Sequence, residues 1–424
     1  MNKNLKILLG GSPCTHWSIA QKNNRETEPE GLGWELFKNF LIANEKFKPD
    51  YFLYENNKSM AKPIRNQIDI EFNHTYAENT NWELVALGEE DKGHTKRWVW
   101  RNKTAGKMEF ITRILINSAL VSAQNRQRYY WTNIPGVPQP QDRGILLRDV
   151  LDSGVTWNEK GYCLTSSYNG AVAWNTLERK QRSMVAEPIR IGTINKGRQG
   201  ERIYSTDGKG IPITANGGGQ GGKTGLYACP IETQGNAKYL LKNLKYSNEK
   251  SGALTASCYK GIGSDGMYTI ALPADGKTYP VYEVKNGLIE IKDKTYPIKL
   301  PDGYYIIRKL TVNECRRLQT IPEWYKMPCS ASQNYKMLGN GWTVEVIKHI
   351  LSHIPNISDC TVEVLSMYDG MSCGQIVLKE LGCKIDKYVS YEIDKYAIQT
   401  TQANFARTEQ RGDAFQVRQE NWKY

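Results

Sequence analysis

Apolar strand-like runs alternate with helical periodicity at both ends of the chain, and this alternation limits the fold more than any other feature. Near the start, residues 5–11 and 50–56 are short apolar runs, and residues 31–47 between them carry apolar side chains at helical spacing. Near the end, residues 362–382 and 388–405 each combine an apolar run with a helical segment. Strands that alternate with helices predict an α/β domain with a parallel sheet.

Four further segments belong to these two end regions. Residues 107–123 are expected to pass from helix to strand, and residues 126–134 to form another strand. Residues 308–322 regain helical periodicity, and Thr311 followed by Glu314 predicts a capping box at a helix start. Residues 341–354 predict one more helix.

The middle of the chain, residues 141–305, has a different character. Glycine, serine, threonine and tyrosine dominate, and helical periodicity disappears. Three similar octapeptides occur at 160–167, 209–216 and 250–257. They could be three β-turn units, or part of a β/loop module that faces DNA with lysine, asparagine and backbone amides. The chain is therefore expected to form three parts, namely residues 1–140, 141–305 and 306–424.

Charge and cysteine content exclude several protein classes. The 424 residues include 56 Lys+Arg and 44 Asp+Glu, so the net charge of +12 predicts a polyanionic partner such as nucleic acid or an acidic membrane surface. No apolar run approaches the roughly 18–20 residues that span a bilayer, which predicts a soluble intracellular protein. Nine cysteines without a C-x-x-C pair indicate neither a disulfide framework nor a zinc site, and no metal is expected.

A glycine turn joins the apolar run that ends at Met367 to the following helix. Residues 368–374 read Tyr-Asp-Gly-Met-Ser-Cys-Gly, and Glu392 lies at the end of the next predicted strand. Such a turn lets backbone approach a nucleotide, and an acid on the next strand can bind ribose hydroxyls. Because the turn is not G-x-G-x-x-G, a pyrophosphate is not favoured. Asp413 could accept a hydrogen bond from an adenine amino group, or could instead cap a helix.

Other reactive side chains follow the predicted strands of the first region. Cys14 comes after Gly10, Gly11 and Pro13 at a strand end, where open α/β sheets bind ligands, so it is either a nucleophile or a buried thiol. Glu55 lies at the end of the next predicted strand. It is either a functional acid at this edge of the sheet or a solvated or ion-paired surface acid. Gln124, Arg126 and Arg128 would share one strand face, which is costly unless acids or a ligand pair with them.

Six segments together resemble the DNA (cytosine-5) methyltransferases. Ser12-Pro13-Cys14 resembles the catalytic Pro-Cys motif, and Glu55-Asn56-Asn57 resembles Glu-Asn-Val with asparagine in place of valine. Residues 124–128 resemble Gln-x-Arg-x-Arg, and residues 308–322 resemble the Arg-x-Leu-Thr segment with Ile321 for phenylalanine. Residues 339–342 resemble the Gly-Asn helix start, and residues 368–374 the S-adenosylmethionine loop in the Asp-Gly variant of the de novo branch.

The order of these segments departs from the family. The family begins with the cofactor loop, whereas here that loop lies near the C-terminus, which resembles a circular permutation with its new join at residues 353–364. The resemblance therefore implies a Rossmann-like, S-adenosylmethionine-dependent methyltransferase sheet that is circularly permuted. It also implies that residues 141–305 form an inserted, β/loop-rich target-recognition domain.

The resemblance implies methyl transfer from S-adenosylmethionine to carbon 5 of cytosine in double-stranded DNA, through a flipped base and a covalent adduct with Cys14. Glu55 would contact ring nitrogen 3, Arg128 would hold the carbonyl oxygen and orient Glu55, and Arg126 would support this network or contact phosphate. The residues expected to bind the cofactor are Pro13, Asn340, Gly341, Trp342, Tyr368, Asp369, Gly370, Met371, Ser372, Gly374, Glu392, Ile393, Asp413, Ala414 and Phe415. The residues expected to contact DNA are Ser18, Lys22, Arg25, Gln124, Lys209, Asn216 and Lys223.

Two other functions share many of these features. An RNA cytosine-5 methyltransferase would use the same chemistry, and a catalytically silent relative would bind DNA only. The presence of both Cys14 and Glu55 argues against the silent relative. The implied protein is a monomeric, cytoplasmic enzyme of prokaryotic or phage origin that acts on DNA, with or without a companion restriction endonuclease, and does not bind a membrane.

Overall fold

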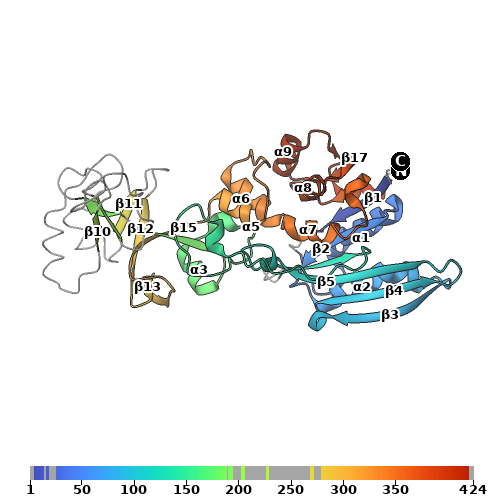
Figure 1. Cartoon of the computed structure of the whole chain (residues 1–424), viewed down its shortest axis with the longest axis horizontal. Helices are drawn as coiled ribbons and strands as arrows, with labels where there is room; N and C mark the ends of the chain where they lie inside the picture. Colours follow the sequence, from blue (N-terminus) through green and yellow to red (C-terminus); the bar gives the residue numbers. More distant parts are fainter. Residues whose placement is uncertain are drawn as a thin grey trace. The chain divides into compact units, whose positions relative to one another are not determined.

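The computed structural model describes residues 4–13, 16–18, 25–188, 190–193, 202–205, 226–228, 268–271 and 278–419. The chain divides into two compact units (Figure 1). Unit 1 comprises residues 1–145, 163–169 and 315–424, and unit 2 comprises residues 146–162 and 170–314.

A sheet of nine strands organises the described part of unit 1. Its order is β18-β17-β16-β1-β2-β6-β5-β4-β3, in which β18 to β2 pair in parallel and the other neighbours pair antiparallel. The strands are β1 (Asn4–Gly10), β2 (Tyr51–Asn57), β3 (Trp82–Glu90), β4 (Thr95–Asn102), β5 (Met108–Asn117), β6 (Gln127–Thr132), β16 (Thr361–Met367), β17 (Lys384–Tyr391) and β18 (Glu409–Gln410).

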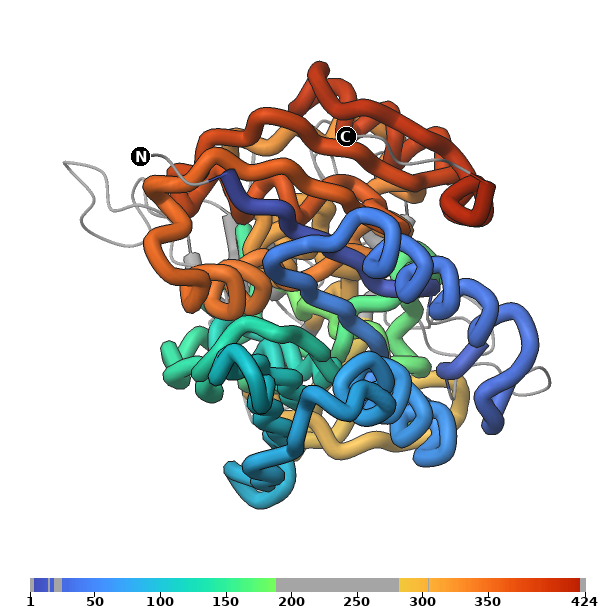
Figure 2. Tube along the Cα trace, turned by 90° about the vertical axis from the view of Figure 1, so that its right-hand side faces the viewer, coloured from blue at the N-terminus to red at the C-terminus, as the bar shows by residue number. Residues whose placement is uncertain are grey.

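Strands from the two ends of the sequence lie side by side in this sheet. β1 pairs in parallel with β16 along its whole length, from Asn4 opposite Thr361 to Gly10 opposite Met367. Figure 2 shows the dark blue start of the chain running beside the orange and red strands. The predicted α/β fold class is confirmed, because both end regions contribute to one mixed sheet with helices.

Six α-helices of unit 1 accompany the sheet in the described residues. They are α1 (Gly31–Phe47), α2 (Lys62–Ala77), α6 (Ala331–Asn340), α7 (Val344–Leu351), α8 (Cys373–Glu380) and α9 (Lys395–Asn404). Short 3-10 turns add η1 (Asp91–Gly93), η2 (Ser118–Leu120), η7 (Ile357–Asp359) and η8 (Ala414–Arg418). α1 occupies the residues that helical spacing predicted, and it ends where Lys48 adopts a left-handed conformation.

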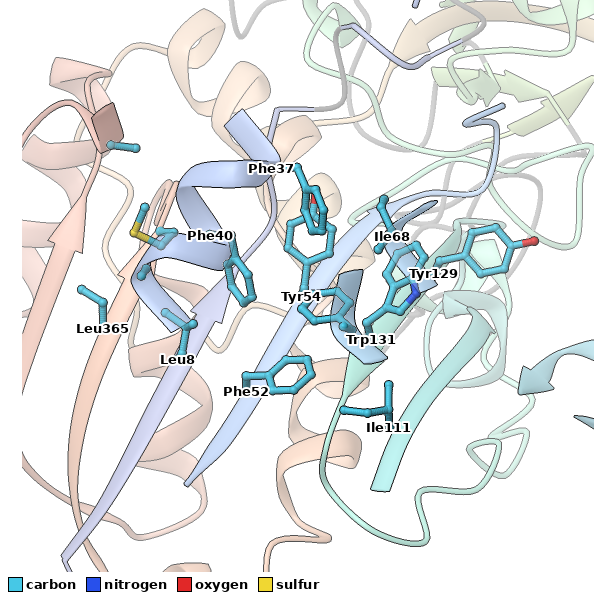
Figure 3. Packing of buried hydrophobic residues seen from close by; sticks show 14 of the residues in the cluster. Leu8, Phe37, Phe40, Phe52, Tyr54, Ile68, Ile111, Tyr129, Trp131 and Leu365 are labelled. Carbon is cyan, nitrogen blue, oxygen red and sulfur yellow. The ribbon is translucent and has the colours of Figure 1, made fainter. Parts of the chain in front are cut away.

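Aromatic side chains hold α1 against the sheet. Phe37 and Phe40 are fully buried one turn apart and face Phe52 and Tyr54 of β2 (Figure 3). The rings of Phe40 and Tyr54 lie 5.0 Å apart between centroids. Burying one such side chain contributes roughly 1.5–3 kcal/mol, so this contact fixes the helix over the strand ends that carry the candidate site.

Two sequence predictions about the sheet were wrong. The sheet is mixed rather than wholly parallel, because four of its eight strand pairings are antiparallel; β3, β4 and β5 follow one another through short connections that only antiparallel pairing allows. Residues 107–123 contain no α-helix: β5 and the 3-10 turn η2 occupy them. The aromatic and β-branched residues of this segment pair with β4 on one side and β6 on the other.

Unit 2 is built mainly from antiparallel strands. One sheet has the order β14-β13-β12-β15-β7, with β11 also paired to β12, and a second has the order β10-β9-β8. The elements are η3 (Leu147–Val150), η4 (Tyr168–Gly170), which begins in unit 1, α3 (Ala173–Arg179), β7 (Met184–Pro188), β8 (Arg190–Thr193), β9 (Arg202–Ser205), β10 (Leu226–Ala228), β11 (Tyr268–Ala271), β12 (Thr278–Lys285), β13 (Leu288–Ile291), β14 (Lys294–Pro297) and β15 (Gly303–Lys309).

The helix predicted after residue 308 is present as α5 (Val312–Leu318). Its capping box is formed: Glu314 N–H donates to Thr311 Oγ1 at 3.1 Å, and Thr311 N–H donates to Glu314 Oε2 at 2.7 Å. Two of the octapeptides, 209–216 and 250–257, lie outside the described residues. The same is true of three residues expected to contact DNA, namely Lys209, Asn216 and Lys223. No helix of the described part is long and apolar enough to cross a membrane.

Candidate active site

A cleft of about 420 Å³ lies in unit 1 at the carboxyl ends of the parallel strands. Segments far apart in the sequence line it together, as expected where ligands bind open α/β sheets. The predicted site residues that line it are Pro13, Glu55, Arg126, Arg128, Asn340, Gly341, Trp342, Tyr368, Asp369, Gly370, Met371, Glu392, Ile393, Asp413, Ala414 and Phe415.

The carboxylate of Asp369 holds the turn after β16 in place. Asp369 Oδ1 accepts hydrogen bonds from Ser366 Oγ at 2.6 Å and Tyr388 OH at 2.8 Å, and Oδ2 accepts from Ser390 Oγ at 3.1 Å and from Ser372 Oγ. Burial raises the pKa of Asp369, and these hydroxyl donors oppose the rise. The carboxylate therefore positions the turn between β16 and α8.

Gly370 occupies the exposed corner of this turn. Its φ of +58° lies in the left-handed region, and a Cβ built on it would meet nothing within 4 Å, so the backbone borders open space. Its N–H donates to Glu392 Oε2 at 2.8 Å. The turn and the end of β17 are thereby joined directly.

Glu392 and its neighbours form the second wall of the cleft. Its Oε1 accepts from the N–H groups of Ile393 and Asp394, both at 2.8 Å, and burial raises its pKa against these hydrogen bonds. The Ile393 side chain is 75% exposed. Asp413 Oδ1 accepts from Phe415 N–H at 2.9 Å and caps η8.

These walls fit an adenosine-containing cofactor. The open corner at Gly370 leaves room for backbone approach, Glu392 supplies a carboxylate for hydroxyl groups, and an exposed isoleucine offers an apolar surface to a base. Among the described residues, no group of histidine, cysteine and acidic side chains could hold a metal ion.

Glu55 sits at the end of β2 with a donor on each oxygen. Arg128 Nε lies 2.9 Å from Oε1 in an ion pair, and Trp342 Nε1 donates to Oε2 at 3.0 Å. The Glu55 side chain is 12% exposed. Arg128 is thus beside Glu55, as the sequence predicted, whereas the contact from Trp342 was not expected.

Arg126 is buried among backbone carbonyls. Its guanidinium donates to the carbonyl oxygens of Leu164 at 2.9 Å, Gly339 at 3.2 Å and Gly341 at 2.8 Å, and the residue is 3% exposed. It therefore fixes the Gly339–Trp342 segment against residues 163–169. In this arrangement Arg126 supports the network around Glu55 rather than presenting its charge at the surface.

Gln124 is fully buried as well. Its Nε2 donates to Leu318 O at 2.7 Å and to Gln319 Oε1 at 3.0 Å, and its Oε1 accepts from Leu164 N–H at 3.1 Å. These contacts satisfy both ends of the amide and leave no side-chain surface for DNA. The described fold therefore uses Gln124 for packing.

The turn that precedes Cys14 is held by polar side chains of β2. Ser12 Oγ and Tyr54 OH are 2.6 Å apart, and Asn56 Nδ2 donates to Ser12 O at 3.3 Å and to Ser12 Oγ at 3.2 Å. The second residue of the Glu-Asn-Asn motif thus anchors the Ser-Pro turn. Cys14 itself lies outside the described residues, as does Lys22.

The remaining predicted residues near this turn and on α8 occupy partly or fully buried positions. Arg25 Nη2 donates to Ser59 O at 2.6 Å, and Ser18 is partly buried. Ser372 and Gly374 are buried at the start of α8. A Cβ on Gly374 would lie 2.6 Å from Leu9 Cδ1, so this glycine serves helix–strand packing beneath the turn.

Cys163, which sequence reasoning missed, contacts two arginines of the site. Its Sγ lies 3.6 Å from Arg126 Nη1 and 4.0 Å from Arg128 Nη2. Burial opposes ionisation, but the two guanidinium groups outweigh it and lower the pKa of Cys163. The only sequence signal was its place in the first octapeptide, 160–167.

Several known methyltransferases are similar to this chain in sequence. The type II methyltransferase M.HhaI of Haemophilus parahaemolyticus is 24% identical over 356 residues, covering 82% of this chain and 75% of the relative. The type II methylase M.HgiEI of Herpetosiphon aurantiacus is 22% identical over 80% of both chains. The orphan methyltransferase M.SPRI of Bacillus phage SPR is 24% identical over 82% of both chains.

The family profile described as C-5 cytosine-specific DNA methylase matches residues 1–78 and 118–356. These ranges make up about three quarters of the chain and include Glu55 of β2, Arg128 of β6 and Trp342 between α6 and α7. The chain belongs to the C-5 cytosine-specific DNA methylase family.

Proposed function

We propose that the protein methylates carbon 5 of a flipped cytosine in double-stranded DNA, with S-adenosylmethionine as donor and Cys14 as nucleophile. Family membership gives the cytosine-5 chemistry. The observation that carries the finer proposal is the single cleft shared by the Ser12–Pro13 turn, the Glu55–Arg128 pair and the Tyr368–Met371 turn. Cys14, Glu55 and the bound cofactor would then all reach the same cytosine.

The first chemical step falls to Cys14 and Glu55. The Cys14 thiolate would form a bond to carbon 6 of the ring while Glu55 hydrogen-bonds or protonates nitrogen 3, which draws electron density from the ring as sulfur adds. A free thiol has a pKa near 8.5, so it needs positive charge nearby, and Arg126 and Arg128, which line the cleft, would supply it. Asn56 and Tyr54 would orient the nucleophile through Ser12.

The adduct makes carbon 5 nucleophilic. Bound S-adenosylmethionine supplies an electrophilic methyl group on a sulfonium. Transfer to carbon 5 would leave S-adenosylhomocysteine. A water molecule would then remove the carbon 5 proton, the electron pair of that bond would re-form the 5,6 double bond and expel the Cys14 thiolate from carbon 6, and any proton placed on nitrogen 3 would return to Glu55. Arg128 would hold the ring carbonyl oxygen through these steps while keeping its ion pair with Glu55.

We assign the cofactor to the walls described above. Glu392 would bind ribose hydroxyls, Asp413 the adenine amino group, and Ile393 and Phe415 the faces of the base. Pro13, Asn340 and Gly341 would border the methionine end. Asp369, Ser372 and Gly374 would act indirectly, by shaping the turn, because their side chains or Cβ positions face the protein interior.

A stacked cytosine cannot reach such a cleft, so the target base would flip out of the duplex at a cost of a few kcal/mol. Ser18, Lys22 and Arg25 belong to the loop we propose as the contact to flipped DNA. We further propose that unit 2 reads the target sequence, with Lys209, Asn216 and Lys223 among its contacts. The net charge of +12 supports this assignment.

We also propose that the chain is a circular permutant of the family. The family profile ends at residue 356, before the Asp-Gly turn, although β16 lies between β17 and β1 in the sheet. A cofactor strand that lies beside β1 in space but near the other end of the sequence is what a permutation would produce. The sheet order needs no change for this rearrangement.

Replacement of Cys14 tests the mechanism. Cys14→Ser should abolish tritium-methyl transfer and covalent trapping on 5-fluorocytosine DNA, while DNA binding persists. Cys383→Ser, at a partly buried thiol beyond α8, is the matched control and should behave as wild type. Near-normal methylation by Cys14→Ser would contradict the proposal. Parallel assays on DNA and RNA of one sequence would show which nucleic acid is the substrate.

A further inference from the structure

We propose that Trp342 is a positioning residue for Glu55, an inference that rests on the catalytic role proposed for Glu55. Its indole Nε1 donates to Glu55 Oε2 at 3.0 Å, while Arg128 Nε pairs with Oε1 at 2.9 Å. The two donors come from different elements, the α6–α7 connection and β6. One donor on each oxygen fixes the rotation of the carboxylate.

The space around this hydrogen bond is filled. A Cβ placed on Gly11 would lie 2.9 Å from Glu55 Oε2 and 3.3 Å from Trp342 Nε1. A larger residue at position 11 would therefore push the two partners apart. Because the Glu55 side chain is only 12% exposed, solvent is a poor replacement for the indole donor.

The backbone on both sides of Trp342 is anchored. Gly341 O accepts from Arg126 Nη2 at 2.8 Å, and Thr343 Oγ1 donates to Gln319 Oε1 at 2.9 Å. The indole thus extends from a fixed point towards the carboxylate. Such preorganisation is what a positioning group requires, since a small displacement of a catalytic group slows a reaction markedly.

Trp342 also lines the cleft together with the turn of Asp369 and Gly370. Within that cleft its indole nitrogen is committed to Glu55. Loss of the indole N–H should accordingly affect the chemical step more than cofactor affinity.

Trp342→Phe keeps a ring in place and removes only the donor. Because a hydrogen bond to a charged group is involved, we expect the single-turnover rate to fall by about 10- to 100-fold. The dissociation constant of S-adenosylhomocysteine, measured by calorimetry, should change much less than the rate, because phenylalanine keeps an aromatic ring in the lining of the cleft. The matched control is Trp100→Phe, whose indole donates to Asn73 Oδ1 at 2.7 Å outside the cleft, and which should leave the rate unchanged.

A double-mutant cycle separates positioning from a general structural role. In a Glu55→Ala background, Trp342→Phe should cause little further loss, because the carboxylate that it positions is gone. A wild-type rate for Trp342→Phe alone, or its full effect repeated in Glu55→Ala, would overturn the inference. A wild-type rate for Glu55→Ala would instead overturn the proposed function, so the two failures can be told apart.

Discussion

The close approach of α6 to residues 165–166 can be tested with glycine-to-alanine substitutions that differ in how tightly the glycine is packed. Gly339 lies in the last turn of α6, and a Cβ built there would lie 2.1 Å from the Thr165 carbonyl carbon and 2.3 Å from Ser166 N. These atoms are backbone, so they cannot move aside as a side chain would. Gly339→Ala must separate the two segments by more than about 1 Å to restore ordinary contact.

The cost of that separation follows from the hydrogen bonds that it breaks. Arg126 Nη1 bridges Leu164 O at 2.9 Å and Gly339 O at 3.2 Å, and it cannot reach both after such a shift. Overpacking costs about 1–3 kcal/mol and a lost bond to a charged group about 1.5–3 kcal/mol. The better helix propensity of alanine offsets up to about 1 kcal/mol, so the free energy of unfolding should fall by about 1.5–6 kcal/mol.

Two other glycines calibrate this expectation. Gly88 in β3 has nothing within 4 Å of a built Cβ, so Gly88→Ala should change the free energy of unfolding by less than about 1 kcal/mol. At Gly374 the obstacles are Leu9 Cδ1 at 2.6 Å and Tyr388 OH at 2.8 Å, both ends of side chains, so Gly374→Ala should be intermediate. Urea unfolding followed by tryptophan fluorescence measures all three. Equal midpoints for Gly339→Ala and Gly88→Ala would refute the reasoning.

Two more perturbations test the buried charges. Asp69→Ala removes the ion-pair partner of buried Arg113 and the acceptor of Trp131 Nε1, so stability should fall by about 3–5 kcal/mol, and Asp69→Ala with Arg113→Met should recover part of it. The lowered pKa of Cys163 means that its thiolate stabilises the fold increasingly as pH rises towards the unfolded-state value near 8.5. The difference in Tm between wild type and Cys163→Ser should therefore grow from pH 6.5 to pH 9; a constant difference would contradict the two-arginine environment.

The sequence predicted those elements whose own residues carry a recognisable pattern, such as helical spacing or a capping box. α1 was visible from helical spacing, and the start of α5 from the capping box of Thr311 and Glu314. The segment of β3 and β4 was not predicted, and it falls within residues 79–117, which the family profile leaves unmatched. β3 has no buried residue and exposes several apolar side chains, and β4 buries only Thr95, Trp98 and Trp100, so neither strand shows a regular alternation of apolar and polar residues.

The candidate site shows a related limit of sequence reasoning. Gln124, Arg126 and Arg128 look alike in sequence, as long polar side chains that need partners. In the structure Gln124 and Arg126 find backbone carbonyls and amides of distant segments, whereas Arg128 pairs with a carboxylate in the cleft. A strand pattern indicates that these polar side chains need hydrogen-bond or ion-pair partners. Which partners they have depends on the segments that the fold brings close to them. Arg126 and Gln124 hydrogen-bond to the segments around α6, and Arg126 anchors the carbonyl of Gly341 next to Trp342, which contacts Glu55. These two residues therefore support the geometry of the site, whereas Arg128 is the member of the motif that pairs with Glu55.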